Sequence, residues 1–266
     1  MKFSIVTSYY NRKKQFINTL ETIKRSNEIN NTEVIVVDDA SDDDHRIEDL
    51  LDTYSFLKII RINKDEKWWS NPSIPFNIAI KEAKGDVIIL QNPECLHLGD
   101  IIEHIKNNIN DNNYLTYSVY SIDETTTNKL HSLNHNESLI EDFKNVIGDK
   151  KNIGITGIGH ECWYNHPLYR PCYYHFISSI TKSNMEKLGG FDERYGEGCS
   201  YDDDEFLFRV KLLGLELKII DEVIGVHQWH YSNDNRNHHF YKKEMINQHI
   251  YNTITKQLTT PKVNIL

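Results

Sequence analysis

Four consecutive carboxylates, from Asp202 to Glu205, stand between a glycine-rich stretch and an apolar run with helical spacing. This spacing predicts a helix that begins just before Asp203 and ends near Gly214, with Ser200 placed as its capping residue. One or two acids in a first helical turn complement the helix dipole, but four repel one another unless a positive group or a transferred proton is present. The run therefore indicates either a general base held among like charges or a solvated helix start.

Three polar loops follow strand-like runs in the first hundred residues, where strand and helix patterns alternate. The continuous β-branched run 34–37 is typical of a parallel strand that is covered on both faces. Such alternation predicts an α/β fold with a mostly parallel, twisted sheet, flanked by helices and joined by right-handed crossovers. Ligands bind such sheets at the carboxyl ends of the strands. This rule selects the loops 7–11, 38–41 and 91–95.

The same patterns place the elements along the chain. Strands are expected at 3–7, 34–37, 57–62, 87–90, 115–120, 176–181, 215–220 and 223–227. Helices are expected around 16–23, 47–51, 75–84, 101–109, 183–188, 203–213 and 240–258. Residues 111–171 are irregular outside one strand, and no linker divides the chain. The pattern therefore predicts one large domain that ends in a helix.

Composition narrows the classes of partner. The 266 residues carry a formal net charge of −9, which argues against non-specific binding of nucleic acid. An anionic substrate would then need a local cation, such as a bound metal. The irregular spacing of the cysteines indicates free thiols in a reducing compartment. Because no stretch approaches the length of a membrane span and no signal sequence precedes the first strand, we expect a soluble, cytoplasmic protein.

Four segments together resemble one known family. They are Ile5-Val6-Thr7-Ser8-Tyr9-Tyr10-Asn11, residues 34–41, Gly189-Gly190-Phe191-Asp192 and residues 201–209. Their order and spacing are similar to those of family 2 and related glycosyltransferases of the GT-A fold, over roughly residues 1–230. The resemblance implies a GT-A, Rossmann-like sheet with an acceptor-side region toward the C-terminus. It also implies a metal-dependent, inverting hexosyltransferase that moves a sugar from a nucleotide-diphosphate donor, UDP foremost, to an acceptor hydroxyl.

The resemblance implies donor-binding roles for residues of the selected loops. Thr7 and Tyr9 match positions that cradle the base of the nucleotide sugar, and Asn92 lies in the loop that meets the donor and its metal. Asp39 matches the acid that accepts a hydrogen bond from the uracil ring, which is a charge-assisted contact. The alternative for Asp38 and Asp39 is a turn and a helix cap.

The loop Gln91-Asn92-Pro93-Glu94 stands where the family carries its metal-binding Asp-x-Asp motif, and it departs from that motif. Only Glu94 supplies charge, whereas hard cations prefer several anionic oxygens. His227, after an apolar strand, matches a histidine that completes the metal shell in many relatives. Mn²⁺, or Mg²⁺, held by Glu94 and His227 is therefore the implied cofactor. A proline-containing turn and a packed histidine are the alternatives.

The resemblance also assigns the catalytic and acceptor positions. Asp203 is the implied catalytic base, and Asp202 takes the first position of the acidic pair, where Glu is commoner. Trp163 and Tyr164 precede this site in the sequence and could stack on a sugar acceptor, or else form an aromatic patch in the core. Lys67 lies before the helix 75–84, where the family often has a basic residue near the diphosphate.

The chain is expected to divide by role within one domain. Residues 1–110 would bind the nucleotide sugar, residues 111–232 would form the acceptor and catalytic half, and residues 233–266 would form a helical tail. The tail would cover the sheet or pair two copies into a homodimer. The expected acceptor is a glycan, a glycoprotein or a small hydroxyl compound.

Other functions compete with this one. The incomplete metal loop favours, as the alternative, a catalytically impaired nucleotide-sugar or glycan-binding protein. A sugar nucleotidyltransferase is disfavoured, because that class needs a glycine-rich loop after the first strand and residues 7–11 contain no glycine. A zinc site is disfavoured because the spacing of its candidate ligands matches no common pattern. These candidates are His160, Cys162, His166, Cys172 and His175.

Overall fold

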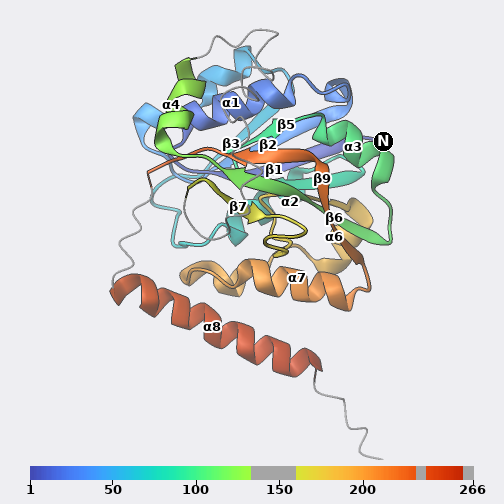
Figure 1. Ribbon diagram of the computed structural model, residues 1–266. Coiled ribbons are helices and arrows are strands. Elements are labelled where there is room, and N and C mark those ends of the chain that lie inside the picture. The colour runs from blue at the N-terminus through green and yellow to red at the C-terminus, as the bar shows by residue number, and fades with distance from the viewer. Residues whose placement is uncertain (133–159, 232–237, 260–266) are drawn as a thin grey trace, which may run out of the picture.

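The computed structural model describes residues 1–132, 160–231 and 238–259 (Figure 1). Within these residues one nine-stranded sheet has the order β3-β2-β1-β4-β8-β6-β9-β5, with β7 beside β6. The strands are β1 Phe3–Tyr9, β2 Thr32–Asp38, β3 Leu57–Arg61, β4 Val87–Gln91, β5 Cys95–Leu98, β6 Asn113–Ser121, β7 Cys162–Asn165, β8 Ile177–Thr181 and β9 Glu216–His227. The α-helices are α1 Lys13–Ile23, α2 Ser73–Glu82, α3 Ile101–Asn108, α4 Glu124–Ser132, α6 Lys182–Leu188, α7 Asp202–Leu212 and α8 His238–Thr259. Short 3₁₀ helices are η1 Ile29–Asn31, η2 Asp43–His45, η3 Glu48–Asp52 and η5 Glu193–Glu197.

The first half of the sheet is parallel, as the alternating pattern predicted. β1 pairs in parallel with β2 and β4, and β2 pairs in parallel with β3. β8 begins beside the last residue of β4, with Ile177 opposite Gln91, and therefore runs back along β4 in the antiparallel sense. β6 pairs with β9 in parallel, so the second half of the sheet is mixed. The α/β fold with flanking helices is confirmed.

Helices cover both faces of the sheet. Val34 and Val36 point into a core shared with α1 and α3, whereas Ile35 and Val37 point into a core shared with α2 and α7. Figure 1 shows α1, α3 and α4 on one side of the strands and α2, α6 and α7 on the other. Because both faces are buried, the run 34–37 is apolar at every position, and each such side chain contributes about 1.5–3 kcal/mol to folding.

Some elements differ from expectation. The two strands expected at 215–220 and 223–227 are one strand, β9, whose pairing with β6 shifts register between Tyr117 and Val119. β5 lies in a stretch expected to be a loop, and β7 and α4 lie in a region expected to be irregular. The short helix expected at 47–51 is the 3₁₀ helix η3. These elements are short or polar, so sequence periodicity marks them weakly.

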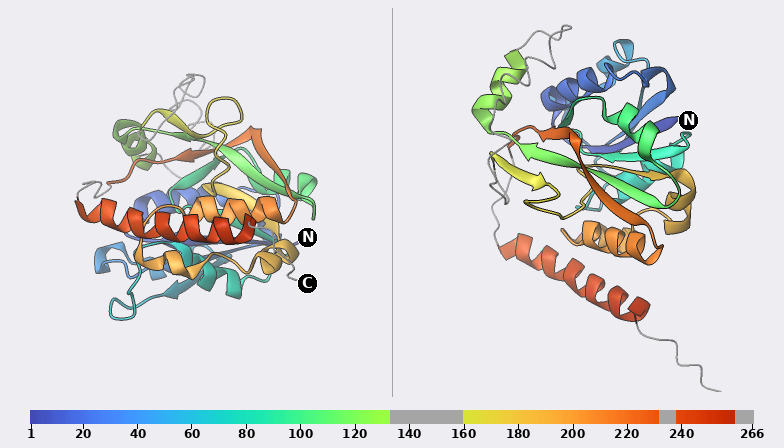
Figure 2. Two further views of the ribbon diagram at one scale, coloured as in Figure 1. Left: turned by 90° about the horizontal axis from the view of Figure 1, so that it is seen from below. Right: turned by 45° about the vertical axis from the view of Figure 1, so that its right-hand side comes forward.

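The C-terminal helix α8 is confirmed, and it packs on α7 and η5 rather than on the sheet. Figures 1 and 2 show it on the outer side of α7. Asn247 and Ile254 are its buried side chains, and Asn247 Nδ2 donates hydrogen bonds to the carbonyls of Ser200, at 2.9 Å, and Tyr195, at 3.2 Å. Neither α8 nor any other described helix is long and apolar enough to cross a membrane.

Candidate functional site

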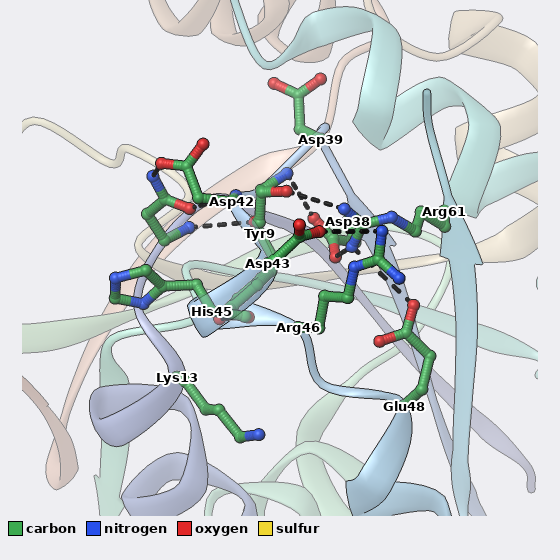
Figure 3. A network of polar contacts seen from close by, with 12 residues as sticks. Tyr9, Lys13, Asp38, Asp39, Asp42, Asp43, His45, Arg46, Glu48 and Arg61 are labelled. Carbon is green, nitrogen blue, oxygen red and sulfur yellow. Dashed lines mark hydrogen bonds and ion pairs between the residues drawn. The ribbon is translucent and has the colours of Figure 1, made fainter. Parts of the chain in front are cut away.

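Asp38, the last residue of β2, and Asp39, which follows it, point their carboxylates in different directions (Figure 3). Asp38 is fully buried; its Oδ2 lies 2.5 Å from Arg61 Nη1, and its Oδ1 accepts the Ser41 backbone N–H at 2.9 Å. Asp39 turns away from this pair, because Ala40 adopts a left-handed conformation with φ 64° and the chain reverses there. The turn role that was an alternative for both residues therefore belongs to Asp38.

Asp39 faces the loop 67–69 instead. Its carboxylate accepts hydrogen bonds from Lys67 Nζ and Trp69 Nε1, both at 2.8 Å. Burial raises the pKa of Asp39, and the hydrogen bond from Lys67 opposes that rise. The Lys67 ammonium also lies 4.6 Å from the centre of the Tyr10 ring. Tyr10 and Trp68 are 47% and 60% exposed, so two open aromatic faces stand beside this carboxylate.

Thr7 and Tyr9 lie in the core below these rings. Tyr9 is fully buried, and its hydroxyl donates to the His45 carbonyl at 2.6 Å. Thr7 is also buried, and its hydroxyl has no hydrogen-bond partner among the described residues. Of the residues around this loop, Tyr10 rather than Tyr9 presents its ring to solvent.

Glu94 is the centre of a second cluster. Its carboxylate is buried, with Oε2 2.7 Å from Arg12 Nη1 and Oε1 3.1 Å from His227 Nε2 and 3.8 Å from His230 Nε2. Glu94 meets His227 because β5 and β9 pair in the antiparallel sense, which sets Cys95 opposite His227. Gln228 donates both its backbone N–H and its side-chain amide to the Glu94 carbonyl at 3.1 Å. The loop is thereby fixed to the end of β9.

The charges of this cluster suit a divalent cation. Burial opposes the charge of Glu94, but Arg12 and the imidazoles hold the pKa of Glu94 well below its usual range. Burial lowers the pKa of His230 to about 4, so its ring is neutral at neutral pH. Ligand atoms of Glu94, His227 and His230 all lie within 4.8 Å of one another. One carboxylate and two imidazoles form a donor set that binds first-row divalent metals.

Side chains around this cluster close it on two sides. The Asn92 amide nitrogen lies 3.5 Å from Glu94 Oε1. The Tyr164 ring lies 4.8 Å from the His227 ring. His227 Nδ1 is buried and has no hydrogen-bond partner among the described residues. Asn92 and Tyr164 are therefore both placed at the candidate metal cluster.

The acid run opens helix α7, and each acid has its own partner. Buried Asp202 accepts a hydrogen bond from Asn71 Nδ2 at 2.8 Å. Asp204 accepts one from the Tyr174 hydroxyl at 2.8 Å. Buried Glu205 forms an ion pair with Arg209, with Oε1 and Nε 2.5 Å apart. Asp203 lies 2.5 Å, Oδ1 to Nδ1, from His175 and keeps 34% of its side chain exposed. The run is therefore not a solvated helix start.

The local backbone differs from the expected cap. The N-cap of α7 is Tyr201, with φ 65° and no side-chain cap, so the prediction that Ser200 caps the helix is wrong. Ser200 also has a left-handed φ of 63°. Two consecutive non-glycine residues in this region are strained, and such strain accumulates at functional sites.

Burial and like charge act on the acid pair. Burial and the neighbouring Asp203 raise the pKa of Asp202 to about 6. Burial opposes the charge of His175, but Asp203, and Asp202 after it, raise the pKa of His175 above its usual value. His175, Asp202 and Asp203 also bring ligand atoms within 4.8 Å of one another. Here, however, the imidazole and a carboxylate already pair directly.

Three consecutive residues join the two clusters. The Tyr174 hydroxyl contacts Asp204, and His175 contacts Asp203. The ring of Phe176 lies 6.4 Å from that of His227, and its carbonyl accepts the Asn92 N–H at 3.0 Å. The segment 174–176, just before β8, therefore contacts the acid pair through His175 and the Glu94 cluster through Phe176.

The loop 67–71 joins the acid pair to Asp39. Trp69 binds Asp39, and Asn71, two residues further on, binds Asp202. Asn71 and Ser70 also donate their backbone N–H groups to the Gly196 carbonyl. Asp39, the acid pair and the Glu94 cluster thus lie on the side of the sheet at which the parallel strands β2 and β4 end.

The two aromatic residues of β7 take opposite sides, as alternation along a strand requires. Trp163 is 3% exposed and packs edge-on against Tyr120 with ring centres 5.2 Å apart. Tyr164 lies on the other side, beside His227. Among the described residues, the candidate zinc ligands His160, Cys162, His166, Cys172 and His175 do not bring their ligand atoms together.

Comparison with known proteins identifies the family. A sequence profile of Glycosyl transferase family 2 matches residues 4–170. The chain belongs to this family. A relative, the uncharacterized glycosyltransferase YfnE of Bacillus subtilis (strain 168), is 26% identical over 271 aligned positions, which cover 88% of this chain and 66% of the relative. The chain thus spans about two thirds of the length of that relative.

Solved structures share the family 2 fold. The TarS 1–349 structure from S. aureus in complex with UDP-GlcNAc has a TM-score of 0.61 and 16% identity, covering 91% of this chain and 64% of that one. The mannosyltransferase PcManGT from Pyrobaculum calidifontis, in complex with GDP-Man and Mn²⁺, has a TM-score of 0.56 and 16% identity, covering 98% and 65%. These likenesses confirm the GT-A fold that the sequence motifs implied.

Four residues of the site were not predicted from the sequence as members of it, and His175 was considered there only as a zinc ligand. His230 stands three residues after His227, a spacing that could have marked it as a second imidazole ligand. Arg12, Asn71 and His175 carry no such signal. They reach Glu94, Asp202 and Asp203 only through pairings between segments far apart in the chain.

Proposed function

We propose that this family 2 chain is an inverting, metal-dependent hexosyltransferase that uses a nucleotide-diphosphate sugar, with UDP as the favoured nucleotide. The observation that carries the proposal is the segment 174–176, in which His175 contacts Asp203 and the ring of Phe176 lies 6.4 Å from that of His227 in the Glu94 cluster. A transferase needs a base for the acceptor and a positive group for the diphosphate in one place. Residues 1–110 then bind the donor, and residues 111–232 supply the acceptor side and the base.

The donor base would bind beside Asp39. A carboxylate oxygen accepts more than one hydrogen bond, so Lys67 and Trp69 orient Asp39 and still leave it able to accept the uracil N–H. The exposed rings of Tyr10 and Trp68 offer stacking faces for the base. In this proposal Tyr10 contacts the base in place of Tyr9, which the resemblance had put at a position that cradles it, and the buried residues Thr7 and Tyr9 support the loop from below.

The donor set around Glu94 fits Mn²⁺ better than Mg²⁺. Two ligands at right angles on one ion, with bonds of about 2.1 Å, lie roughly 3 Å apart, and Glu94 Oε1 and His227 Nε2 are 3.1 Å apart. Mg²⁺ favours all-oxygen shells, whereas this group offers two imidazoles. Glu94, His227 and His230 would hold the ion, which would neutralise charge on the departing diphosphate when bound.

Asp203 would act as the base. It accepts the proton of the acceptor hydroxyl while the hydroxyl oxygen forms a bond to the anomeric carbon. The bond from that carbon to the diphosphate oxygen breaks, and the electron pair leaves with the nucleoside diphosphate. One such displacement inverts the anomeric centre. Asp202 and Glu205 are buried, and the partly exposed Asp204 is held by the Tyr174 hydroxyl, so Asp203, with 34% of its side chain exposed, is the acid that we assign as the base.

The acceptor would lie between Asp203 and Tyr164. Tyr164 is partly exposed beside His227, whereas Trp163 supports β7 from the core. A glycan, a glycoprotein or a small hydroxyl compound fits this position, because each presents a hydroxyl that a partly open carboxylate can reach. A homodimer through α8 remains a prediction, for which light scattering of the full chain is the measurement.

Donor binding is tested by thermal unfolding with a panel of UDP-, dTDP- and GDP-sugars, with and without Mn²⁺. A ligand at about 100 times its Kd stabilises a protein by about 2.7 kcal/mol. Because each kcal/mol raises Tm by about 2–4 °C for a chain of this size, the expected shift is roughly 5–10 °C. We expect UDP-sugars to give the largest shift, and only with Mn²⁺. No shift with any nucleotide sugar would contradict the proposal. A shift without any turnover of the donor would favour the catalytically impaired alternative.

A further inference from the structure

His175 is an imidazole in a place that an apolar ring would fill. Its ring is edge-on to Phe76 and Phe191, with centres 5.2 and 5.0 Å apart, and it is 7% exposed. Burying a polar ring is unfavourable unless the ring makes a hydrogen bond. The contact that compensates is the ion pair between Nδ1 and Asp203 Oδ1, which lie 2.5 Å apart.

We propose that His175 is a positioning residue for the base: its Nδ1–H holds one oxygen of Asp203, which directs the other oxygen to the acceptor hydroxyl. The proposal rests on the proposed function, since it takes Asp203 as the base. It adds a role for a residue that no sequence motif marks.

The neighbours of Asp203 show why a separate holder is needed. Asp202 is fixed by Asn71, and Asp204 is fixed by Tyr174. Asp203 lies between these two, keeps 34% of its side chain open, and would rotate freely without its own donor. A base that rotates spends less time in the geometry that proton transfer needs.

The charges around His175 also support its role as a positioning residue. The charged groups that act on its ring are Asp203 and Asp202, both on α7. The other faces of the ring meet Phe76 of α2 and Phe191, which carry no charge. An imidazolium beside two adjacent carboxylates reduces their mutual repulsion, and the charge of His175 opposes the rise in the pKa of Asp202.

The pairing itself is tested without any substrate. Full-length protein with ¹⁵N-labelled histidine, kept in EDTA, is titrated by NMR that reports the His175 ring nitrogens. We expect the ring of the wild type to stay protonated to a higher pH than that of the Asp203→Asn variant. An identical His175 titration in both proteins would overturn the proposal. The wild type is also titrated without EDTA. A difference between wild type and Asp203→Asn that appears only without EDTA would overturn the proposal too, because a cation rather than a proton would then join the two residues.

Positioning is tested by the pH profile of donor turnover, measured as nucleoside diphosphate released from the UDP-sugar that stabilises the protein most. His175→Asn keeps a donor near the Nδ1 position but carries no charge, so the acid limb should move about one unit to higher pH. His175→Phe keeps the packing but loses the donor, and kcat should fall by about tenfold or more at every pH while the donor KM changes less than about twofold.

A matched control is His104→Asn in α3, where the imidazole contacts Tyr117 away from the acid pair. This variant should keep the wild-type profile. A His175→Phe variant that folds and turns over the donor at the wild-type rate would show that His175 only fills space. If Asp203→Asn retained full turnover while the NMR pairing was intact, the proposed function would fail and the pairing would stand.

Discussion

His227 Nε2 lies 3.1 Å from Glu94 Oε1 because β5 and β9 run antiparallel and set Cys95 opposite His227. This pairing brings the end of the chain's last strand to the loop after β4. It also explains why a family 2 chain without the usual Asp-x-Asp motif still gathers a carboxylate and two imidazoles. The arrangement leads to predictions about metal, donor, pH and the C-terminal helix.

Replacement of a ligand in the Glu94 cluster should weaken Mn²⁺ binding. His227→Ala removes one imidazole from the group of three, and we expect at least about a tenfold loss in Mn²⁺ affinity. Titration of free Mn²⁺ by electron paramagnetic resonance measures this loss directly. His104→Asn is the control, since His104 lies on α3 and contacts Tyr117. Equal affinity in wild type and His227→Ala would remove His227 from the metal site.

Replacement of Asp38, the last residue of β2, should lower the stability of the fold, whereas replacement of Asp39, the next residue, should weaken donor binding. Asp38→Asn breaks the pair between the buried Asp38 carboxylate and Arg61, whose side chain is 22% exposed, and we expect a loss of about 3 kcal/mol in the free energy of unfolding. Asp39→Asn keeps hydrogen-bonding capacity beside Trp69 but removes the charge facing the base, and we expect about tenfold weaker UDP binding. Urea unfolding and calorimetry with UDP measure the two effects. The reverse pattern would show that Asp38, not Asp39, meets the donor.

Acid should destabilise the fold through a buried histidine of β5. Burial lowers the pKa of His97 to about 4, below the usual value of about 6.5 for histidine. The unfolded chain therefore binds the proton first, and stability falls as pH drops from about 6.5 toward 4. His97→Gln, which can keep a hydrogen bond to Gln91, should reduce this slope of stability against pH. Urea unfolding between these two pH values measures it, and parallel slopes in both proteins would contradict the assignment.

Contact between α8 and the loop before α7 should be needed for the site to form. A Cβ on Gly198 would lie 1.9 Å from Asn247 Oδ1, so Gly198→Ala forces α8 away from the loop that precedes Asp202. We expect a lower Tm and lower donor turnover. The double variant Gly198→Ala with Asn247→Ala should recover part of both, since the colliding atoms are removed. Additive losses in that double variant would show that the contact has no such role.

Part of this site could be predicted from the sequence, and part could not. The parallel strands 34–37 and 87–90 gave continuous apolar runs, so the position of Asp39 and Glu94 at strand ends followed from pattern alone. The cap of α7 could not be predicted, because Tyr201 adopts a left-handed conformation that tertiary contacts impose. Alternation along β7 likewise separates Trp163 from Tyr164 only once its strand partner is known.

The pairings across the site depend on the folded chain. His175 meets Asp203 only because β8 starts beside the end of β4 and α7 packs over it. Arg12 reaches Glu94 from the start of α1 for a similar reason. Such contacts join segments with no shared sequence signal. They also determine which acid of the run 202–205 stays open to a substrate.

The most direct test of the account is donor turnover by the Asp203→Asn variant, with Asp204→Asn as its neighbour control on the same helix. Wild type and both variants are incubated with Mn²⁺ and the best-binding nucleotide sugar, and release of the nucleoside diphosphate is followed. Loss of a general base slows a reaction by about 100- to 10,000-fold, so Asp203→Asn should lose turnover to that extent while donor affinity and Asp204→Asn activity stay close to wild type. Wild-type turnover by Asp203→Asn would contradict the role of Asp203 as the base.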